Sequence, residues 1–277
     1  MKNLIKKSNL LVNEALPYMQ LFKGKIIIIK YGGAAMIKDK LKRSVMQDIA
    51  FLHTVGIKPV VVHGGGPFIS DRMRQAKLKP EFVDGLRVTD AKTIEITREV
   101  FSEVSLEIIG TLSNLGVQAM PIHDAITVEQ KNKKLGFVGE IKAIDTDKIN
   151  AVLGQNVIPV ISPLGRKGNQ VYNINADTVA TYLVASLCAE KLTILTDVDG
   201  VLENGKLISH LSIRAARQHI KKGVITKGMI PKIEACIHAV ESGCKKAHLI
   251  NGTIPHSLLF EIFTAHGIGT EIVKNGS

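Results

Sequence analysis

The sequence predicts an α/β fold with a doubly wound, mostly parallel sheet. β-branched residues run without interruption through 26–29 and 60–62, as they do in strands that are covered on both faces. Strand-like and helix-like segments then alternate over the length of the 277-residue chain. Such alternation is typical of parallel strands joined by crossover helices. We therefore expect helices on both faces of one large sheet.

The apolar periodicity predicts each element in turn. Helical spacing after each of the first two strands predicts a helix that ends at a glycine. The apolar faces are Leu41, Val45, Ile49 and Leu52 before Gly56, and Val100, Val104, Ile108 and Leu112 before Gly116. The later elements that we expect are strands at 117–122 and 157–161, a hairpin or lid within 124–148, a helix at 178–189, a strand near 191–195, helices near 212–222 and 230–242, a strand at 247–250, and a final helix and strand.

Residues 1–22 precede the first core strand and are predicted to form an N-terminal helical arm. Apolar residues lie at helical spacing along it, at Val12, Ala15, Leu16, Met19 and Phe22. Pro17 lies within this stripe and predicts a kink or a break in the helix. The stripe needs a cover, which is either the chain's own sheet or a neighbouring subunit.

The charge and the aromatic content argue against a nucleic-acid partner. The chain carries 36 lysines and arginines against 25 acidic residues, a net charge of +11. The lysines lie in scattered doublets, which favours an ordinary solvated surface with some extra charge at an anion site. The chain has no tryptophan and only 4% aromatic residues, so few side chains are available to stack on bases.

The cysteines and the hydropathy indicate an intracellular protein without a membrane span. Cys188, Cys236 and Cys244 are odd in number and lack metal-ligand spacing, which favours reduced thiols. No apolar run has the length of a membrane span, and residues 10–17 lack the apolar core of a signal peptide. We expect the cytoplasm of a bacterium or the stroma of a plastid.

Two glycine-rich turns follow the first two strands. They are Lys30-Tyr31-Gly32-Gly33 and His63-Gly64-Gly65-Gly66. Glycine lets backbone N–H groups come close to a ligand that a side chain would push away. Two such turns at one sheet edge, with the charge of Lys30 between them, predict a grip on anionic groups. This arrangement suggests phosphoryl chemistry.

Other nucleotide and metal motifs are incomplete in this sequence. Gly223 and Gly228 have the spacing of a Walker A loop, but Met229 stands in the place of its lysine. Asp197 and Asp199 begin like a calcium-binding loop, but the later ligands are missing. This segment is better interpreted as a turn after a strand, at an edge where ligands commonly bind.

Several candidate residues have an ordinary structural alternative. Lys30 alone would be a solvated lysine at a strand end, and a histidine such as His63 most often only hydrogen-bonds the following loop. Asp177 precedes a helical pattern and has the position of an N-cap, a role worth about 1 kcal/mol. Asn173 and Asn175 alternate and would point to the same side of a strand.

Lys232 follows Pro231, which is well placed as the first residue of a helix. A lysine in the first turn opposes the helix dipole and is mildly unfavourable there. This small misfit favours an anion-binding role for Lys232.

Six segments together resemble the amino acid kinase family. They are 30–33, 63–66, 85–89, 173–177, 196–200 and 228–232. They follow the family's order and cover nearly the whole chain from residue 23. The resemblance is strongest to members that act on N-acetyl-L-glutamate. It implies ATP-dependent phosphorylation of the γ-carboxylate, the second step of arginine biosynthesis through acetylated intermediates.

The resemblance implies a role for each matched residue. Lys30 and Lys232 would stabilise the transferring phosphoryl group, and Asp177 would hold both lysines in place. The backbone of Gly32, Gly33 and Gly65 would contact phosphate. The remaining assignments are Gly65, Gly66, Arg87 and Asn173 to the acceptor, with Arg87 on its α-carboxylate, and Gly32, Gly33, Thr196, Asp197, Gly200 and Gly228 to the nucleotide. Mg²⁺ would be carried by ATP. The chain would divide into the arm at 1–22, an acceptor-binding lobe at 23–188 and a nucleotide-binding lobe at 189–277.

The residue types agree with a carboxylate acceptor. A γ-carboxylate, with a reference pKa of about 4.3, is already ionised at neutral pH and requires no general base. Two unit charges at about 4 Å repel by roughly 4 kcal/mol at an effective dielectric of 20. Lysines, Mg²⁺ and oriented N–H groups offset this repulsion, so catalysis would be mostly positioning and electrostatics.

The arm and the C-terminal tail resemble the arginine-inhibited, hexameric branch of these kinases. In that branch the arm pairs subunits, and arginine lies between the arm and the C-terminal lobe. The matching candidates are Tyr18, Lys206, Glu261 and Gly267. The resemblance leaves open whether a PII-type signalling protein binds. Ala34 and Lys227 depart from common family residues, and Lys227 is expected near the nucleotide.

Three competing functions remain at the level of sequence. A sister kinase would act on acetylaminoadipate, glutamate or carbamate, although Arg87 and Asn173 disfavour carbamate. A non-catalytic arginine sensor would require the loss of a catalytic lysine or of Asp177, and none is lost. A nucleic-acid-binding protein is the weakest alternative.

Overall fold

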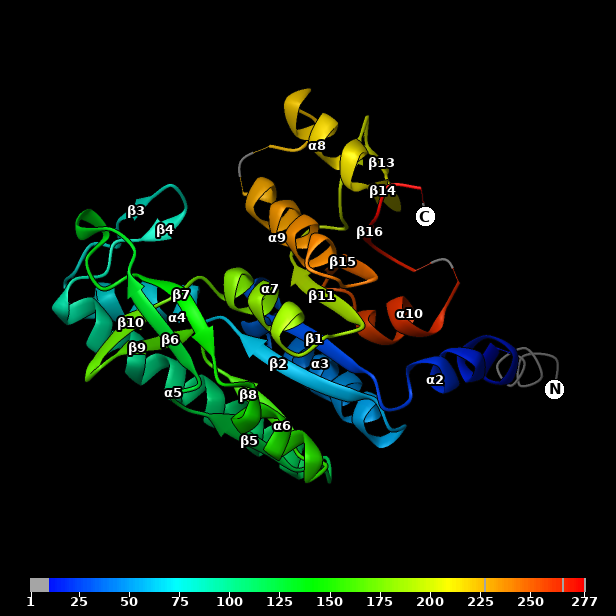
Figure 1. Ribbon diagram of the computed structural model, residues 1–277, viewed down its shortest axis with the longest axis horizontal. Coiled ribbons are helices and arrows are strands. Elements are labelled where there is room, and N and C mark those ends of the chain that lie inside the picture. Colours follow the sequence, from blue (N-terminus) through cyan, green and yellow to red (C-terminus); the bar gives the residue numbers. More distant parts are fainter. Residues whose placement is uncertain (1–9, 227, 266, 277) are drawn as a thin grey trace.

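The computed structural model describes residues 10–226, 228–265 and 267–276. Within them, eight strands form a central sheet in the order β14-β16-β15-β11-β1-β2-β8-β5 (Figure 1). These strands are β1 (Ile26–Tyr31), β2 (Lys58–His63), β5 (Ala119–Ile122), β8 (Ile158–Ile161), β11 (Lys191–Thr196), β14 (His210–Ser212), β15 (Lys246–Asn251) and β16 (Thr270–Val273). Every pairing from β15 to β5 is parallel, whereas β16 pairs antiparallel with β15 and β14 pairs parallel with β16, so these two edge strands run opposite to the rest. The predicted mostly parallel sheet is confirmed.

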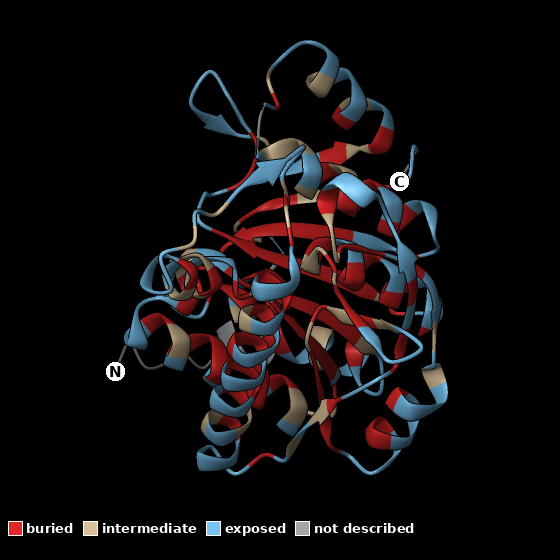
Figure 2. Cartoon of the chain, turned by 90° about the vertical axis from the view of Figure 1, so that its left-hand side faces the viewer, coloured by how far each residue is buried: buried red, intermediate tan, exposed pale blue. Residues whose placement is uncertain are grey.

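Helices cover both faces of this sheet. The longer helices are α3 (Asp39–Thr54), α4 (Gly66–Gln75), α5 (Ala91–Asn114), α6 (Thr146–Gly154), α7 (Ala176–Ser186), α8 (Ile213–Lys221), α9 (Met229–Glu241) and α10 (Ser257–Phe263). Two short 3-10 helices are η2 (Gly33–Met36) and η3 (Lys133–Leu135). Residues from α6, α7, α8 and α9 pack in one core, and residues from α3, α4, α5 and α10 pack in the other. Figure 2 shows the buried strands between these layers, with the outer helix faces exposed.

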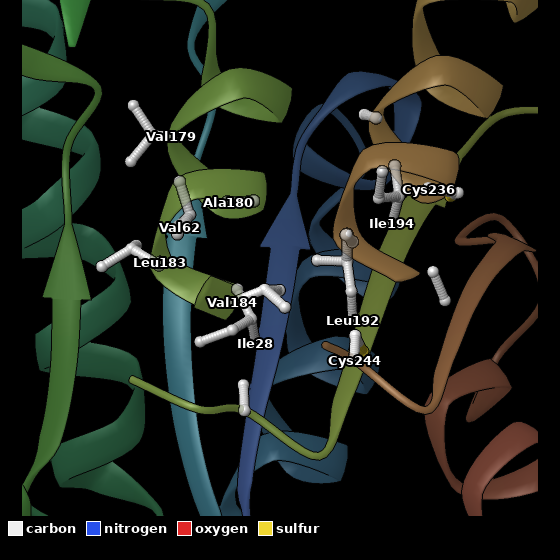
Figure 3. Close-up of a cluster of buried hydrophobic side chains, with 14 of the residues drawn as sticks. Ile28, Val62, Val179, Ala180, Leu183, Val184, Leu192, Ile194, Cys236 and Cys244 are labelled. Carbon is white, nitrogen blue, oxygen red and sulfur yellow. The ribbon is translucent and has the colours of Figure 1, made fainter. Parts of the chain in front are cut away.

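The alternation of side chains along β1 explains why its isoleucines are continuous. Ile28 points into the core beneath α7 and α9, whereas Ile27 and Ile29 point into the core on the opposite face. Figure 3 shows the first of these cores, where Ile28 lies beside Val184 of α7. All three isoleucines are fully buried. The prediction of a strand covered on both faces is therefore correct.

A smaller sheet lies at one end of the molecule (Figure 1). Its order is β10-β9-β6-β7, made of β6 (Ile126–Gln130), β7 (Gly139–Ile144), β9 (Leu164–Lys167) and β10 (Gln170–Asn173). Two short hairpins join β3 (Phe82–Val83) to β4 (Leu86–Arg87) and β12 (Leu202–Glu203) to β13 (Lys206–Leu207). Of the two expectations for 124–148, the hairpin is confirmed by the antiparallel pairing of β6 with β7.

The described part of the N-terminal arm lies at the opposite end from the small sheet (Figure 1). It contains the π-helix η1 (Leu10–Ala15) and the α-helix α2 (Leu16–Phe22), so the helix type changes just before Pro17. Phe22 is buried in the chain's own core, and Ala15 joins it. Leu16 is 45% exposed and Leu21 is 58% exposed. The chain's own domain thus covers only part of the stripe, and residues 1–9 lie outside the described residues.

Two local predictions are wrong. Helix α9 begins at Met229, so Pro231 is its third residue and not its first. A proline is tolerated there because the first N–H groups of a helix have no partner within it. Asn175 does not continue the strand, because β10 ends at Asn173 and Asn175 caps α7.

Candidate active site

The two glycine turns lie side by side at one edge of the sheet. β1 and β2 are parallel neighbours, with Tyr31 opposite His63 at their ends. The N–H of Gly64 donates to the Tyr31 carbonyl at 2.7 Å and ties one turn to the other. A Cβ at Gly32 would lie 3.0 Å from Lys30 Nζ, so a larger residue there would crowd the ammonium group. The predicted pair of turns is confirmed.

A carboxylate between two lysines occupies the same edge. Lys30 Nζ lies 2.9 Å from Asp177 Oδ1, and Lys232 Nζ lies 3.3 Å from Asp177 Oδ2. The side chains of Lys30 and Asp177 are each only 10% exposed. Burial alone would raise the pKa of Asp177, but the charges of Lys30 and Lys232 outweigh it and hold that pKa below its ordinary value. Asp177 is therefore ionised at neutral pH.

Because Asn175 caps helix α7, the Asp177 carboxylate is not needed as a cap and can pair with the two lysines. The Asn175 Oδ1 accepts the N–H groups of Asp177 at 2.8 Å and of Thr178 at 3.1 Å, which makes Asn175 the N-cap of α7. Asp177 lies in the first turn and its carboxylate points to the lysines. The alternative of Asp177 as an N-cap is therefore wrong.

A cavity of about 250 Å³ opens beside this triad. The predicted acceptor residues are all in its lining, namely Gly65, Gly66, Arg87 and Asn173, and so are Gly32 and Gly33. The Asn173 side-chain amide donates to Thr89 Oγ1 at 3.3 Å, which holds the amide at the end of β10. The lining thus combines glycine backbone, the guanidinium of Arg87 and the amides of Asn173 and Asn175, which suits a small acceptor with a carboxylate.

Arg87 is anchored by neutral partners. Its Nη2 donates to the Gly66 carbonyl at 2.9 Å and to Ser70 Oγ at 2.8 Å, and the guanidinium lies 4.7 Å from the Phe82 ring centre. Burial lowers the pKa of Arg87. No carboxylate among the described residues forms an ion pair with it, so its charge remains available to an anion. No motif in the sequence points to Ser70, although its place four residues after Gly66 on α4 puts it on the same helix face.

Four of the predicted nucleotide residues, Thr196, Asp197, Gly200 and Gly228, lie outside this cavity. Thr196 ends β11, which is the parallel neighbour of β1. Asp197 follows and accepts the Thr196 hydroxyl at 3.2 Å. Gly200 has φ +141°, and a Cβ there would lie 2.5 Å from Thr270 Oγ1. Gly228 directly precedes α9. Lys227 lies outside the described residues.

A second cavity of about 330 Å³ lies between the arm and the C-terminal part of the chain. Tyr18, Glu261 and Gly267 are in its lining, but Lys206 lies on the exposed β12–β13 hairpin and is not. The structure therefore brings three of the four candidates together.

Buried ionic groups surround Glu261 in this second cavity. His248 Nδ1 contacts Glu261 Oε1, and the N–H of Ile268 donates to Oε2 at 2.9 Å. Burial opposes ionisation of Glu261, but the bond from His248 and the neighbouring positive charges lower its pKa to about 2. Burial lowers the pKa of Lys191, which also lines the cavity. Lys191 and His248 could not be predicted from the sequence as members of this site, because only the pairing of β11 with β15 brings them together.

The fold and the site define a class of protein. The model of the amino acid kinase family matches residues 25–251, and the chain belongs to this family. The chain is 46% identical to the acetylglutamate kinase of Thermosynechococcus vestitus, over 96% of this chain and 94% of the relative. It is 43% identical to the acetylglutamate kinase of Desulforamulus reducens, over 98% and 99% of the two chains.

Solved structures share the fold. The N-acetylglutamate synthase of Neisseria gonorrhoeae, in complex with coenzyme A and N-acetyl-glutamate, superposes with a TM-score of 0.87 at 26% identity. The match covers 96% of this chain but only 63% of the synthase. The carbamate kinase of Giardia lamblia has a TM-score of 0.69 at 18% identity over 91% of this chain and 99% of the kinase. At that identity the carbamate kinase supports the fold alone.

Neither a membrane-spanning helix nor a metal-binding cluster is found among the described residues. No helix in this part of the chain is long and apolar enough to cross a membrane. No group of three or more His, Cys, Asp or Glu side chains within it is arranged to bind a metal ion.

Proposed function

We propose that this protein transfers the γ-phosphoryl group of ATP to the γ-carboxylate of N-acetyl-L-glutamate, the reaction named by its acetylglutamate kinase relatives. The observation that carries the proposal is the Lys30–Asp177–Lys232 triad at the edge where the two glycine turns meet. The triad has a net charge of +1, because two ammonium groups face one carboxylate. This positive charge would attract the two anionic substrates, while each lysine keeps Asp177 as its ion-pair partner.

The chemical step needs charge compensation more than proton transfer. A γ-carboxylate oxygen attacks the γ-phosphorus, a new P–O bond forms, and the bond to the β-phosphate oxygen breaks. The attacking group is already ionised, so no side chain has to remove a proton. Lys30 and Lys232 would face the charge on the transferring group, and Asp177 would fix the distance between them.

The two sides of β1 would hold the two substrates. Arg87 would bind the α-carboxylate of the acceptor, with Asn173 on its other polar groups, because both line the 250 Å³ cavity. On the other side, ATP would lie against the turn after β11. Thr196, Asp197, Gly200 and Gly228 would shape that nucleotide site, and the backbone of Gly32 and Gly33, which lines the 250 Å³ cavity, would contact the phosphates. Mg²⁺ would enter with ATP and neutralise phosphate charge.

We also propose that L-arginine regulates the enzyme from the 330 Å³ cavity. The carboxylates of Glu261 and Glu271 in its lining suit a guanidinium, and Tyr18 brings the arm to the same place. A solved synthase relative, 25% identical with a TM-score of 0.86, is in complex with L-arginine. Lys206 remains a predicted contact, to be tested by Lys206→Ala.

The oligomer, the lobes and the compartment are proposals of the same kind. The exposed Leu16 and Leu21 of the arm would pair subunits into a hexamer, a trimer of dimers. Residues 23–188 would form the acceptor lobe and 189–277 the nucleotide lobe. We place the protein in a bacterial cytoplasm or a plastid stroma, and a PII-type protein is to be tested as a partner.

Deleting residues 1–22 should reduce the mass measured by light scattering and relieve arginine inhibition. An unchanged hexamer would contradict the role of the arm.

One assay tests the reaction itself. Purified protein with ATP and Mg²⁺ is offered N-acetyl-L-glutamate, L-glutamate and acetylaminoadipate in turn, and hydroxylamine traps any acyl phosphate. We expect hydroxamate with N-acetyl-L-glutamate and little with the other two. Lys30→Ala and Lys232→Ala should each lower kcat sharply. Absence of product with N-acetyl-L-glutamate would reject the proposed function, and product mainly with acetylaminoadipate or glutamate would indicate a sister kinase.

A further inference from the structure

The buried ring of His63 holds the peptide that joins Gly64 to Gly65. His63 Nδ1 lies 2.8 Å from the Gly64 carbonyl oxygen, and Nδ1 carries the proton because a carbonyl can only accept. Nε2 is then an acceptor, and the Ser105 hydroxyl on α5 donates to it at 2.8 Å. Burial lowers the pKa of His63 to about 4, so the ring is neutral at physiological pH. Both ring nitrogens therefore have a partner.

This bond sets the direction of the Gly65 N–H. All described peptide bonds are trans, and in a trans peptide the C=O and the next N–H point in opposite directions. The Gly64 carbonyl points to the His63 ring, which does not line the 250 Å³ cavity, whereas Gly64 and Gly65 do line it. The Gly65 N–H is consequently directed to the cavity side.

The other backbone groups of these two glycines are already paired. The Gly64 N–H donates to the Tyr31 carbonyl at 2.7 Å, and the Gly65 carbonyl accepts from the Ile69 N–H at 2.9 Å. Among the described residues, nothing accepts a hydrogen bond from the Gly65 N–H. It is the donor that the turn leaves for a ligand.

Aromatic packing beside the turn keeps the same arrangement. The His63 ring meets Phe101 edge to face, with the ring centres 5.6 Å apart. Phe101 also lies against Gly65, where a Cβ would come within 2.7 Å of its ring. His63, Phe101 and Ser105 are thus buried side chains, and they leave the glycine turn no space to shift toward them.

We propose that His63 is a positioning residue, which holds the Gly64 carbonyl so that the Gly65 N–H donates to an anionic oxygen of the transferring phosphoryl group. This inference rests on the proposed phosphoryl transfer. The ring touches no substrate and moves no proton. Donors aimed in advance at developing charge are worth about 100- to 1,000-fold in kcat, so a partly misdirected donor is expected to cost about 10- to 100-fold.

A matched pair of variants separates positioning from packing. In His63→Asn the amide nitrogen falls near the place of Nδ1 and still donates to the Gly64 carbonyl. In His63→Gln the amide nitrogen falls near the place of Nε2 and reaches Ser105 instead. Both variants remove the ring, so they lose similar packing. We expect kcat within about 5-fold of wild type for His63→Asn and about 10- to 100-fold lower for His63→Gln, with the KM for ATP little changed in both.

The outcomes separate this inference from the proposed function. Equal kcat losses in the two variants, with an active wild type, would overturn the positioning role. A wild type that makes no acyl phosphate would reject the function instead. Nitrogen NMR of histidine-labelled wild type provides a test that needs no variant. The neutral tautomer of His63 should carry its proton on Nδ1, and a proton on Nε2 would overturn the inference.

Discussion

Replacing Asp177 by asparagine removes the one negative charge between two lysines and keeps the size of the side chain. In the native protein each carboxylate oxygen faces one ammonium group, at 2.9 Å for Lys30 and 3.3 Å for Lys232. Unit charges at these distances attract by about 5 to 6 kcal/mol at an effective dielectric of 20. The cost of burying all three groups offsets much of that attraction.

The expected loss follows from what the variant leaves behind. Removing one partner of a buried ion pair costs about 3 to 5 kcal/mol, because the remaining charge is unpaired. Since the Lys232 side chain is 24% exposed, we expect the lower limit, about 3 kcal/mol of unfolding free energy. That corresponds to a fall in Tm of about 6 to 12 °C for a chain of this size. We expect kcat to fall about 100-fold, as it does when catalytic groups shift by about 1 Å.

The pH dependence identifies the cause. The pKa of Asp177 is lower in the folded protein than in the unfolded chain. Its ionic stabilisation is therefore complete above the ordinary carboxyl value of about 3.9 and is lost as the pH falls through the folded value. The difference in stability between wild type and Asp177→Asn should consequently shrink below about pH 4.

Urea unfolding from pH 7 to pH 3 measures this difference. Asp124→Asn is the control, because Asp124 pairs with Arg166 at the surface and should contribute less than about 1 kcal/mol. A difference for Asp177→Asn that is the same at pH 7 and pH 3 would refute the ionic explanation. A loss no larger than that of the control would refute it as well.

Three further substitutions test other parts of the structure. Gly65→Ala places a methyl group 2.7 Å from the Phe101 ring, so kcat should fall about 10-fold or more and partly recover when Phe101→Ala is added. No recovery would reject the steric explanation. Gly267→Ala strains a residue at φ +57° and crowds Glu261 Oε2 at 2.7 Å, so arginine should inhibit about 10-fold less strongly while basal kcat is kept. Unchanged inhibition would place arginine elsewhere. Ile28→Ala empties part of a fully buried site and should lower the unfolding free energy by about 2 to 5 kcal/mol, and a loss below about 1 kcal/mol in urea unfolding would contradict that burial.

The sequence was sufficient to predict the edge at which the two glycine turns meet. Continuous β-branched runs identify buried parallel strands, and parallel neighbours necessarily end on the same side. Gly32 lies beside Lys30 because the two are only two residues apart, which needs no long-range information. The helices found at 10–22 of the arm were also predictable, because the apolar stripe and Pro17 are local signals.

Other features could not be predicted, because the local sequence does not distinguish between alternative structures. Asn175 and Asp177 are both good N-cap residues, and helix starts are uncertain by one or two positions. Only the packing of α7 shows that Asn175 is the cap and that Asp177 faces the lysines. The ionic cavity around Glu261 was also hidden, since Lys191 and His248 meet only through strand pairing.

The central place of β1 in the sheet has a consequence while the chain is being synthesised. One edge of this strand is covered early by β2, but its other partner, β11, begins only at Lys191. Roughly 160 residues separate the end of β1 from that partner, which is about 8 to 32 s of synthesis at common ribosomal rates. During that interval an isoleucine-rich edge is open to pairing with another chain. The same strand that carries Lys30 is therefore the part of the nascent protein that most needs protection from aggregation.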